Sequence, residues 1–387
     1  MFNSSGEFLD SSSLPLPPSS LTIALVCNIK KSEEAPHVAS HAVPPDELPP
    51  TDAPSPSHRA NDLYAEWDTE DTVEAVRDAL SERHTVDIVE AGPGAVQKLI
   101  DLRPDFAFNI AEGLHGVARE AQMPAVFELL QIPYLGSDPL TLATCLDKAR
   151  TKEVLSYHGI PTAPFSVVTS MEAFDDIRVR FPAIVKPMHE GSSKGIYNSS
   201  VARNIEDLER EVRTTLEVYR QPVLIEEFLA GREFTVAIMG NGSEAHALPI
   251  VEISFAALPE GMNPIYSYEA KWVWDSVENP LDIYSCPANL TPELEREIVG
   301  LSLRTYEALR CRDWTRVDLR LNSKGEPHVL EVNPLPGILP RPEDNSCFPK
   351  AARAAGMTYS QLINGVLDIS LRRHGIARAH QTVLQTN

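Results

Sequence analysis

Apolar runs and amphipathic segments alternate along the first third of the chain. Residues 21–29 are almost continuously apolar, which is typical of a strand buried on both faces. Val73, Val76 and Leu80 recur at helical spacing within 69–84. Further strand-like and helical segments follow in turn at 85–91, 94–103 and 105–113. Strands that alternate with helices predict a doubly wound parallel sheet, so this part of the fold belongs to the α/β class.

The pattern changes beyond residue 138. Asp138 and Pro139 suit the N-cap and first position of a helix, which should run to about Tyr157 and stop before Gly159. Residues 181–200 predict a strand, a Gly-rich turn and a second strand, and a helix over 204–220 and two strands over 222–240 follow. The last predict strands near 246–254, a helix over 291–309, a two-stranded hairpin over 314–337 and a closing helix over 358–375. This order indicates two α+β lobes.

The composition indicates how the chain divides into tails, a domain with an insertion, and two lobes. The first residues are rich in Ser and Pro, and the segment after the first strand is rich in Pro, Ser and His. Both contain too few large apolar side chains to pack. We expect a tail over 1–20, an N-terminal α/β domain over 21–140 with a Pro-rich insertion at 31–60, a small lobe over 141–240, a second lobe over 241–376 and a tail over 377–387.

Charge and cysteine usage narrow the classes of partner and compartment. The 387 residues carry a formal net charge of -21, which argues against nucleic acid and anionic membrane surfaces as partners. No apolar run approaches the roughly 18 residues of a membrane span. The five cysteines are scattered without CxxC spacing, which indicates reduced thiols and no structural zinc. The N-terminus lacks the basic start of a signal peptide, so we expect a cytoplasmic protein.

The candidate chemistry is concentrated in the hairpin at 314–337. Two strands joined by the turn NSKG would place Asp318 opposite or nearly opposite Glu331, with Asn333 on the face of Glu331. Opposed carboxylates repel by a few tenths to about 1 kcal/mol, and a divalent cation removes that repulsion. Two carboxylates and an amide oxygen are hard donors that suit Mg2+ or Mn2+. Arg316 can stabilise developing negative charge. The alternative is a solvated surface hairpin.

A Gly- and Ser-rich turn follows Lys186, which ends an apolar strand. Gly191 allows backbone N–H groups to approach an anion closely, and Ser192 and Ser193 add hydroxyl donors. The order of residues is not that of a Walker A loop. The turn predicts a cover for nucleotide phosphates, with an ordinary turn as the alternative.

Other polar residues suit the rest of a nucleotide and a substrate. Glu226 ends a strand that leads into a hinge and can accept a hydrogen bond from an adenine amino group, and Glu233 can accept from ribose hydroxyls. Lys271 lies in an aromatic, loop-like segment and can reach a terminal phosphate. His115 follows a predicted strand end, where sheets of this type place ligands. The alternatives are a charged edge strand, a surface lysine and a structural histidine.

Eight motifs occur in order over about 190 residues: DK in a helix, VKP, EGSS, LIEEF, GREFTV, YEAKW, RVD and LEVNPLPG. This order resembles the ATP-grasp superfamily and, within it, the D-alanine–D-alanine ligase family, over roughly residues 105–372. The resemblance implies an ATP-grasp fold, in which ATP lies between two α+β lobes that follow a doubly wound domain. It also implies ATP-driven acyl-phosphate chemistry, two Mg2+ ions (or Mn2+) and small amino-acid substrates.

The resemblance further implies roles for individual residues. The phosphate-contacting lysines match Lys148 and Lys186, the adenine hinge matches Glu226, Phe228 and Leu229, and the ribose carboxylate matches Glu233. The ligands of the two metal ions match Asp318, Glu331 and Asn333. The lysine of the mobile loop matches Lys271, a serine near the first substrate matches Ser192, and the groups that hold the tetrahedral intermediate match Arg316 and the N–H of Gly337.

Three departures from the family pattern concern the substrate. The loop after the first strand lacks the family's Ser and Glu, and Glu33 and Glu34 are the candidate replacements for the Glu. The closing loop has Trp272 where the family has Tyr, and an indole N–H donates but does not accept. The segment after NPLPG is longer than usual, and both Ser346 and Arg341 are candidates to bind the carboxylate of the second amino acid.

The sequence therefore predicts an ATP-dependent carboxylate–amine ligase that forms a peptide bond. D-alanine–D-alanine ligase in peptidoglycan precursor synthesis is the leading hypothesis. A related ligase that joins a different amino acid or peptide pair is the second, because all three departures concern the substrate. A nucleotide-binding protein without catalysis is the third. A homodimer would fit the family.

Overall fold

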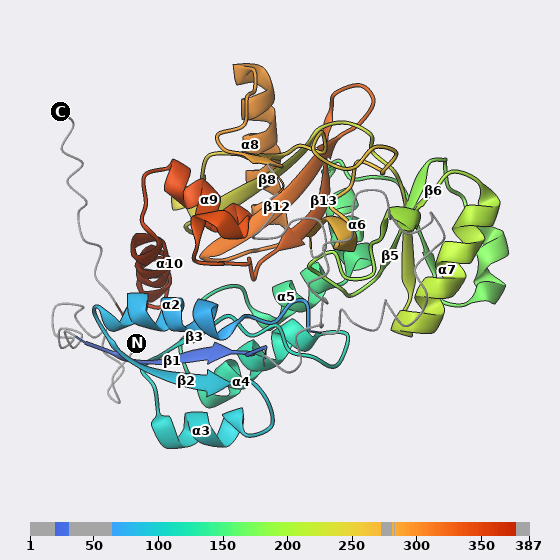
Figure 1. Ribbon diagram of the computed structural model, residues 1–387. Coiled ribbons are helices and arrows are strands. Elements are labelled where there is room, and N and C mark those ends of the chain that lie inside the picture. The colour runs from blue at the N-terminus through green and yellow to red at the C-terminus, as the bar shows by residue number, and fades with distance from the viewer. Residues whose placement is uncertain (1–19, 31–63, 272–280, 282, 377–387) are drawn as a thin grey trace.

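Three β-sheets organise the part of the chain that the computed structural model describes, which is residues 20–30, 64–271, 281 and 283–376. Along the chain, a three-stranded parallel sheet is followed by a four-stranded and then a six-stranded antiparallel sheet. In Figure 1 the four-stranded sheet lies to the right, and the six-stranded sheet lies above the three-stranded one. One parallel and two antiparallel sheets confirm the predicted combination of an α/β part with α+β lobes. The predicted tails and the Pro-rich insertion lie outside the described residues, except for Ser20.

The N-terminal sheet is parallel and covered on both faces. Its strands are β1 (Thr22–Cys27), β2 (Thr85–Glu90) and β3 (Phe106–Asn109), in the order β2-β1-β3. Alternate residues of β1 face opposite sides, so Ile23 and Leu25 pack in one core and Ala24 and Val26 in another. Helices α2 (Glu70–Ser81) and α10 (Tyr359–Arg373) contribute to the first core, and α3 (Ala95–Leu102) and α4 (Gln122–Leu130) to the second. This confirms the predicted doubly wound sheet.

The helix predicted from Pro139 to about Tyr157 is two helices. α5 (Pro139–Leu146) and α6 (Lys148–Tyr157) are separated by Asp147, whose backbone is extended at φ -82° and ψ 100°. The Asp147 side chain accepts hydrogen bonds from the N–H groups of Ala149 and Arg150, and this cap competes with continuation of the helix. The break places Lys148 at the first position of α6.

The four-stranded sheet forms the small lobe. Its strands are β4 (Phe165–Val168), β5 (Ala183–Pro187), β6 (Val201–Ala202) and β7 (Val223–Glu227), in the order β4-β7-β5-β6. Helix α7 (Ile205–Tyr219) packs on it through Leu208 and Val212. The turn between β5 and β6 carries the Gly- and Ser-rich segment, so the sheet presents that turn at one edge.

The six-stranded sheet forms the large lobe. Its strands are β8 (Glu233–Met239), β9 (His246–Ala247), β10 (Val251–Ile253), β11 (Tyr284–Ser285), β12 (Trp314–Leu321) and β13 (Pro327–Asn333). The order is β11-β10-β8-β12-β13, with β9 paired to β8. Helix α8 (Pro292–Ala308) packs against Val317 and Leu319 on one face. Because residues alternate, Arg316 and Asp318 lie on the other face.

The predicted boundary of the small lobe at residue 240 is wrong for β8. β8 pairs with β10 and β12 and so belongs to the large sheet. The chain crosses between lobes at Gly231, whose N–H donates to the Leu321 carbonyl at 3.0 Å. A Cβ at Gly231 would lie 2.5 Å from that oxygen, so only glycine permits this crossing. Helix α6 also packs with the large lobe through Leu155, and Ile160, just after the helix, joins the same core.

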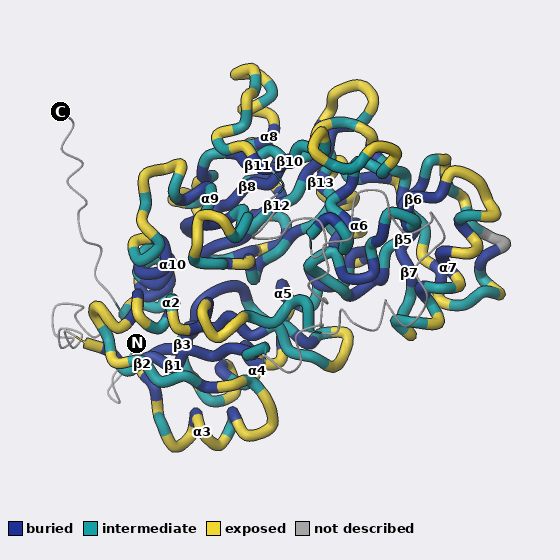
Figure 2. Tube along the Cα trace, viewed as in Figure 1, coloured by how far each residue is buried: buried dark blue, intermediate teal, exposed yellow. Residues whose placement is uncertain are grey.

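Helix α9 (Cys347–Ala354) is an element that the sequence pattern did not predict. It is short and contains Pro349 in its first turn, where the missing N–H costs nothing. Phe348, Ala351 and Ala352 pack in the core between the large sheet and the N-terminal domain. Figure 2 shows the corresponding dark tube along α9, α10 and the strands beside them. Among the described residues, no helix combines the length and apolarity that crossing a bilayer requires.

Candidate active site

A cavity of about 640 Å3 lies where the N-terminal domain, the small lobe and the large lobe meet. Its volume falls within the range of small-molecule sites. Most residues predicted for the site line it: Lys186, Gly191, Ser192, Ser193, Glu226, Phe228, Leu229, Glu233, Lys271, Arg316, Asp318, Glu331, Asn333, Gly337, Arg341 and Ser346. Three separate parts of the fold therefore bring these residues together.

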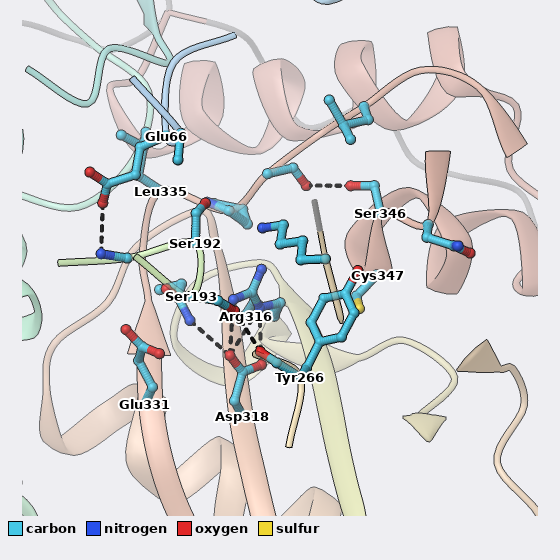
Figure 3. A pocket seen from close by; sticks show the side chains of 18 of the residues that line it. Glu66, Ser192, Ser193, Tyr266, Arg316, Asp318, Glu331, Leu335, Ser346 and Cys347 are labelled. Atoms are coloured by element: carbon cyan, nitrogen blue, oxygen red, sulfur yellow. Dashed lines mark hydrogen bonds and ion pairs between the residues drawn. The ribbon is translucent and has the colours of Figure 1, made fainter. Parts of the chain in front are cut away.

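The floor of the cavity is the β12–β13 hairpin. Asp318 is paired with Glu331, and Arg316 with Asn333, with a bulge after Asp318. The predicted opposition of the two carboxylates is confirmed. The guanidinium of Arg316 contacts Asp318 Oδ2 at 2.9 Å, and Asn333 Nδ2 donates to the same oxygen at 3.1 Å. Figure 3 shows Asp318 with Arg316, and Glu331 beside it on the neighbouring strand.

Two lysines hold Glu331 ionised. Lys148 Nζ lies 3.0 Å from Glu331 Oε1 and also donates to the Glu190 carbonyl. Burial would raise the pKa of Glu331, but Lys148 and Lys186 outweigh it and lower that pKa. Ionised carboxylates beside an amide form the oxygen donor set of hard cations, so Asp318, Glu331 and Asn333 fit Mg2+ in their chemistry.

Arg316 and Lys271 supply positive charge beside the carboxylates. Burial would lower the pKa of Arg316, but Asp318 and its other acidic neighbours raise it, so the guanidinium stays charged. Burial lowers the pKa of Lys271 to about 8, and the Arg316 charge adds to that shift. The pKa of Lys271 therefore lies close to neutral pH, whereas Arg316 stays protonated.

The turn at 191–195 is held in an unusual backbone conformation. Ser192 and Ser193 have φ values of 49° and 60°, a left-handed region that such residues seldom adopt. Ser193 Oγ donates to the Tyr266 carbonyl at 2.7 Å, which ties the turn to the segment before Lys271. The turn faces the cavity as the predicted phosphate cover requires.

The structure gives Glu226 partners that the sequence did not indicate. One carboxylate oxygen lies 2.7 Å from Lys152 Nζ, and the other accepts from Lys186. Burial would raise the pKa of Glu226, but the two lysines outweigh it and lower that pKa to about 2. The two lysines therefore keep Glu226 ionised at the wall of the cavity, and its acceptance of a hydrogen bond from adenine remains a prediction. Lys152, which is 1% exposed, was missed because nothing in its helical pattern marks it as buried.

Glu233 also has a partner. Arg320 Nη1 contacts Glu233 Oε2 at 2.9 Å, and its guanidinium lies 4.7 Å from the centroid of the Phe228 ring. The salt bridge uses one of the two carboxylate oxygens of Glu233. Phe228, Glu233 and Arg320 all line the cavity. A ribose contact by Glu233 remains a prediction.

Several predicted substrate contacts are placed elsewhere or lie beyond the described residues. His115 is exposed at the tip of its loop and does not line the cavity; the same loop contributes Glu112 instead, so the prediction for His115 is not supported. Arg341 lines the cavity but pairs with Asp71. Ser346 Oγ donates to the Gly337 carbonyl at 3.0 Å. Trp272 lies outside the described part of the chain.

Glu66 is the main site residue that sequence reasoning missed. Its segment returns to the end of β1, where Asp68 N–H donates to the Asn28 carbonyl at 3.2 Å. Glu66 Oε1 accepts from Gly191 N–H at 2.7 Å, the contact drawn as a dashed line in Figure 3. Glu33 and Glu34, the predicted replacements, lie outside the described residues. Removing the insertion from the sequence would have placed AEWD directly between the first strand and its helix.

Three carboxylates form an acidic wall, which we define as Glu66, Glu112 and Glu120. One oxygen from each lies within 4.8 Å of the others. Burial and the neighbouring carboxylates raise the pKa of Glu112 well above its ordinary value. Burial, partly offset by Arg119, raises the pKa of Glu120 to about 7. Such a wall attracts a cationic group, either an ammonium or a metal ion.

Comparison with known proteins gives a consistent result. The family model described as D-ala D-ala ligase C-terminus matches residues 154–368. A D-alanine–D-alanine ligase of Haemophilus influenzae is 36% identical over 68% of this chain and 83% of its own length. One of Bordetella petrii is 36% identical over 75% of this chain and 84% of its own length. An uncharacterized protein of Sinorhizobium fredii, y4sG, is 38% identical over 69% of this chain and 75% of its own length.

Solved structures are similar over most of the chain. A D-alanine–D-alanine ligase of Bacillus anthracis matches with a TM-score of 0.62 and 25% identity, covering 92% of this chain and 98% of that one. The same enzyme complexed with ATP matches with a TM-score of 0.61 and 23% identity, which shows the shared fold. With the family model, the sequence relatives and the ATP-grasp architecture in agreement, the chain belongs to the D-alanine–D-alanine ligase family.

Proposed function

We propose that the protein is an ATP-dependent ligase that joins two amino acids, with D-alanine–D-alanine ligation in peptidoglycan precursor synthesis as its first candidate reaction. The observation that carries the proposal is the pairing of Asp318 with Glu331 across β12 and β13, beside Lys148. Two opposed carboxylates repel each other, and a divalent cation removes that repulsion. The same cation can bind the phosphates of a nucleotide. Membership of the family supplies the reaction class.

The chemistry requires two steps. In the first, the γ-phosphoryl group of ATP passes to an oxygen of the first substrate's carboxylate, and ADP leaves. In the second, the amine of the second substrate attacks the carbonyl carbon, phosphate leaves, and the amine loses a proton. Lys186 and Lys271 would hold the phosphates, and Arg316 with the N–H of Gly337 would stabilise the oxyanion. Asp318, Glu331 and Asn333 would hold Mg2+, which when bound neutralises charge on the phosphates.

The acidic wall supports an ammonium subsite for the first amino acid. Glu66 is the member nearest to Ser192, because it binds the N–H of the preceding Gly191. A carboxylate at this point would accept the α-ammonium while the substrate's carboxylate turns toward the phosphates. Glu66 thereby takes the place of the carboxylate that the loop after the first strand lacks.

We expect Glu66→Gln to raise the KM for the first amino acid by roughly 10- to 100-fold, because a hydrogen bond to a charged group contributes about 1.5–3 kcal/mol. The KM for ATP should change less. Steady-state ADP release measures both constants. Glu74→Gln, on the exposed face of α2, is the matched control and should leave both unchanged. An unchanged amino-acid KM in Glu66→Gln would place the ammonium elsewhere.

A ligase for a different amino-acid pair is the second candidate. It is favoured by the engagement of Arg341 with Asp71, which occupies one of the two side chains predicted to bind the second carboxylate. ADP release with a panel of D- and L-amino acids and dipeptides separates the two candidates. Turnover with D-alanine alone supports the first, whereas turnover only with another pair eliminates it. ADP release with none of them would eliminate ligase activity and favour a nucleotide-binding protein.

The compartment and the assembly also remain proposals. All five cysteines are free of disulfides in the structure, which agrees with a reducing compartment such as the cytoplasm. A homodimer is proposed from the family alone, and light scattering after size-exclusion chromatography would test it.

A further inference from the structure

Arg119 is a buried arginine that the proposed chemistry does not use. It begins the short 3-10 helix Arg119–Ala121, and 5% of its surface is exposed. Its Nη2 lies 2.5 Å from Glu66 Oε1, and its Nη1 donates to the carbonyl of His189. The first contact lies within the N-terminal domain, and the second reaches the small lobe. One guanidinium therefore bridges two parts of the fold.

The bridge closes into a ring of contacts. Glu66 Oε1, which accepts from Arg119, also accepts from Gly191 N–H at 2.7 Å. His189 and Gly191 are two residues apart, immediately before the Ser192–Ser193 turn. Arg119 thus holds the carboxylate proposed to bind the ammonium, and holds the start of the turn proposed to cover the nucleotide phosphates.

The turn and the Glu66 carboxylate are in direct contact at Gly191. A Cβ on Gly191 would lie 2.7 Å from Glu66 Oε1, so the turn and the carboxylate are already at contact distance. A displacement of either one must displace the other or break the hydrogen bond between them. The ring therefore has the geometry of a mechanical link between two ligand subsites.

The segments that carry Arg119 and Glu66 are also tied together without the ion pair. Trp67 Nε1 donates to the Gly113 carbonyl at 3.1 Å. Gly113, at φ +70°, lies so close to Arg119 that a Cβ would be 2.8 Å from the Arg119 carbonyl oxygen. Loss of the guanidinium should leave these two contacts in place, so the effect of the Arg119 side chain can be measured separately.

We propose that Arg119 is a positioning residue that couples binding of the first amino acid to closure of the nucleotide-covering turn. This inference rests on the proposed function. An ammonium that binds Glu66 fixes the carboxylate, Arg119 and Gly191 together, and so favours the turn conformation that holds the phosphates. Linkage makes the effect reciprocal, so bound nucleotide must raise the affinity for the amino acid by the same factor.

Arginine is suited to this position and lysine is not. The planar guanidinium donates in two directions at once, here to a carboxylate and to a carbonyl on different segments. A lysine ammonium is a point charge whose donors all leave one nitrogen, so it does not reproduce the two separate arms that Arg119 directs at Glu66 and His189. The neighbouring acidic residues keep the pKa of Arg119 raised in spite of burial, which would lower it, so the charge persists at every relevant pH.

The test measures the coupling factor in the full-length protein by calorimetry. The probes are a non-hydrolysable ATP analogue with Mg2+ and an amino acid that the wild-type protein turns over. We expect the analogue to tighten amino-acid binding about 10-fold in the wild type, within the usual range of coupling. In Arg119→Gln the factor should fall to about 1. Arg150→Gln, which removes an exposed arginine paired with Glu153, is the matched control and should keep the wild-type factor.

Each outcome decides between the alternatives. A wild-type coupling factor in a folded Arg119→Gln protein overturns the proposal, even if both affinities have weakened equally, because a merely structural role predicts that equal loss. If Arg119→Gln does not fold, Arg119→Lys decides. It keeps the positive charge without the planar two-armed guanidinium, so reduced coupling supports the proposal and wild-type coupling overturns it. Failure of the proposed function is distinct, because the wild-type protein itself would then release no ADP with any amino acid, and both proposals would fall.

Discussion

Replacing Glu331 with Gln should abolish turnover and leave the fold intact. The side chain keeps its shape but loses the charge that opposes Asp318 across the hairpin. A metal ion contributes several kcal/mol to the transition state of phosphoryl transfer, so its weakened binding should lower kcat by about 100-fold or more. The measurement is the rate of ADP release at saturating ATP, Mg2+ and amino acid, with circular dichroism to confirm the fold.

The matched control for this variant lies on the same hairpin. Glu326→Gln changes a carboxylate at the exposed turn, where it accepts a hydrogen bond from Asn322. In the strand register this turn lies away from Asp318 and Glu331. The variant should retain the wild-type rate. Calorimetry provides a second readout, because Glu331→Gln should also weaken the dependence of nucleotide binding on Mg2+. A near-native rate in Glu331→Gln with Mg2+ present would show that the assignment of the metal ligands is wrong.

Replacing Glu226 with Gln should destabilise the protein more than any exposed substitution. The change removes the carboxylate that Lys152 and Lys186 share, and it leaves the Lys152 ammonium, which is 1% exposed, close to a second cation. Removing one partner from a buried ion pair costs about 3–5 kcal/mol, and the free energy of unfolding from urea denaturation should fall by that amount. Glu209→Gln, which removes an exposed pair with Arg213, should change it by less than about 0.5 kcal/mol.

The pH dependence gives a further check on Glu226. Its pKa is about 2 in the folded protein and near the ordinary 4.5 when unfolded, so the carboxylate stabilises the fold above pH 4.5. That stabilisation is lost as the pH falls from 4.5 toward 2. The difference in stability between the wild type and Glu226→Gln should therefore be full at pH 7 and should shrink below pH 4.5. If the variant instead lost only nucleotide affinity at unchanged stability, Glu226 would be an adenine acceptor.

The β12–β13 hairpin was predictable because the features that determine its pairing are local. Strand alternation places residues of one parity on one face, and the Asn322–Glu326 turn sets the pairing, with Asn322 Oδ1 accepting from the N–H groups of Lys324 and Glu326. Those two rules were sufficient to oppose Asp318 and Glu331. The bulge after Asp318 could not be predicted from alternation alone, because alternation assumes that one residue faces one residue along the whole pair of strands.

The errors arise where a residue's partners lie far along the chain. The sequence did not indicate the ion pairs of Glu226, because its partners, Lys152 and Lys186, come from a separate helix and strand. β8 was placed in the small lobe because it follows β7 directly, although its pairing partners are β10 and β12. Strands that follow each other in the sequence need not pair, because backbone hydrogen bonding decides which sheet a strand joins.

The sequence by itself determined the succession of strands and helices, the pairing within the hairpin and the set of motifs that defines the family. The first two depend on side-chain periodicity or turn chemistry over a few tens of residues at most, whereas the motifs indicate the family through their resemblance to its pattern. Only the tertiary structure placed Glu66 against Gly191, 125 residues away, and Arg119 against His189, 70 residues away. Those contacts form where separate domains pack, and packing depends on shapes and charges contributed by the whole chain rather than by any one segment.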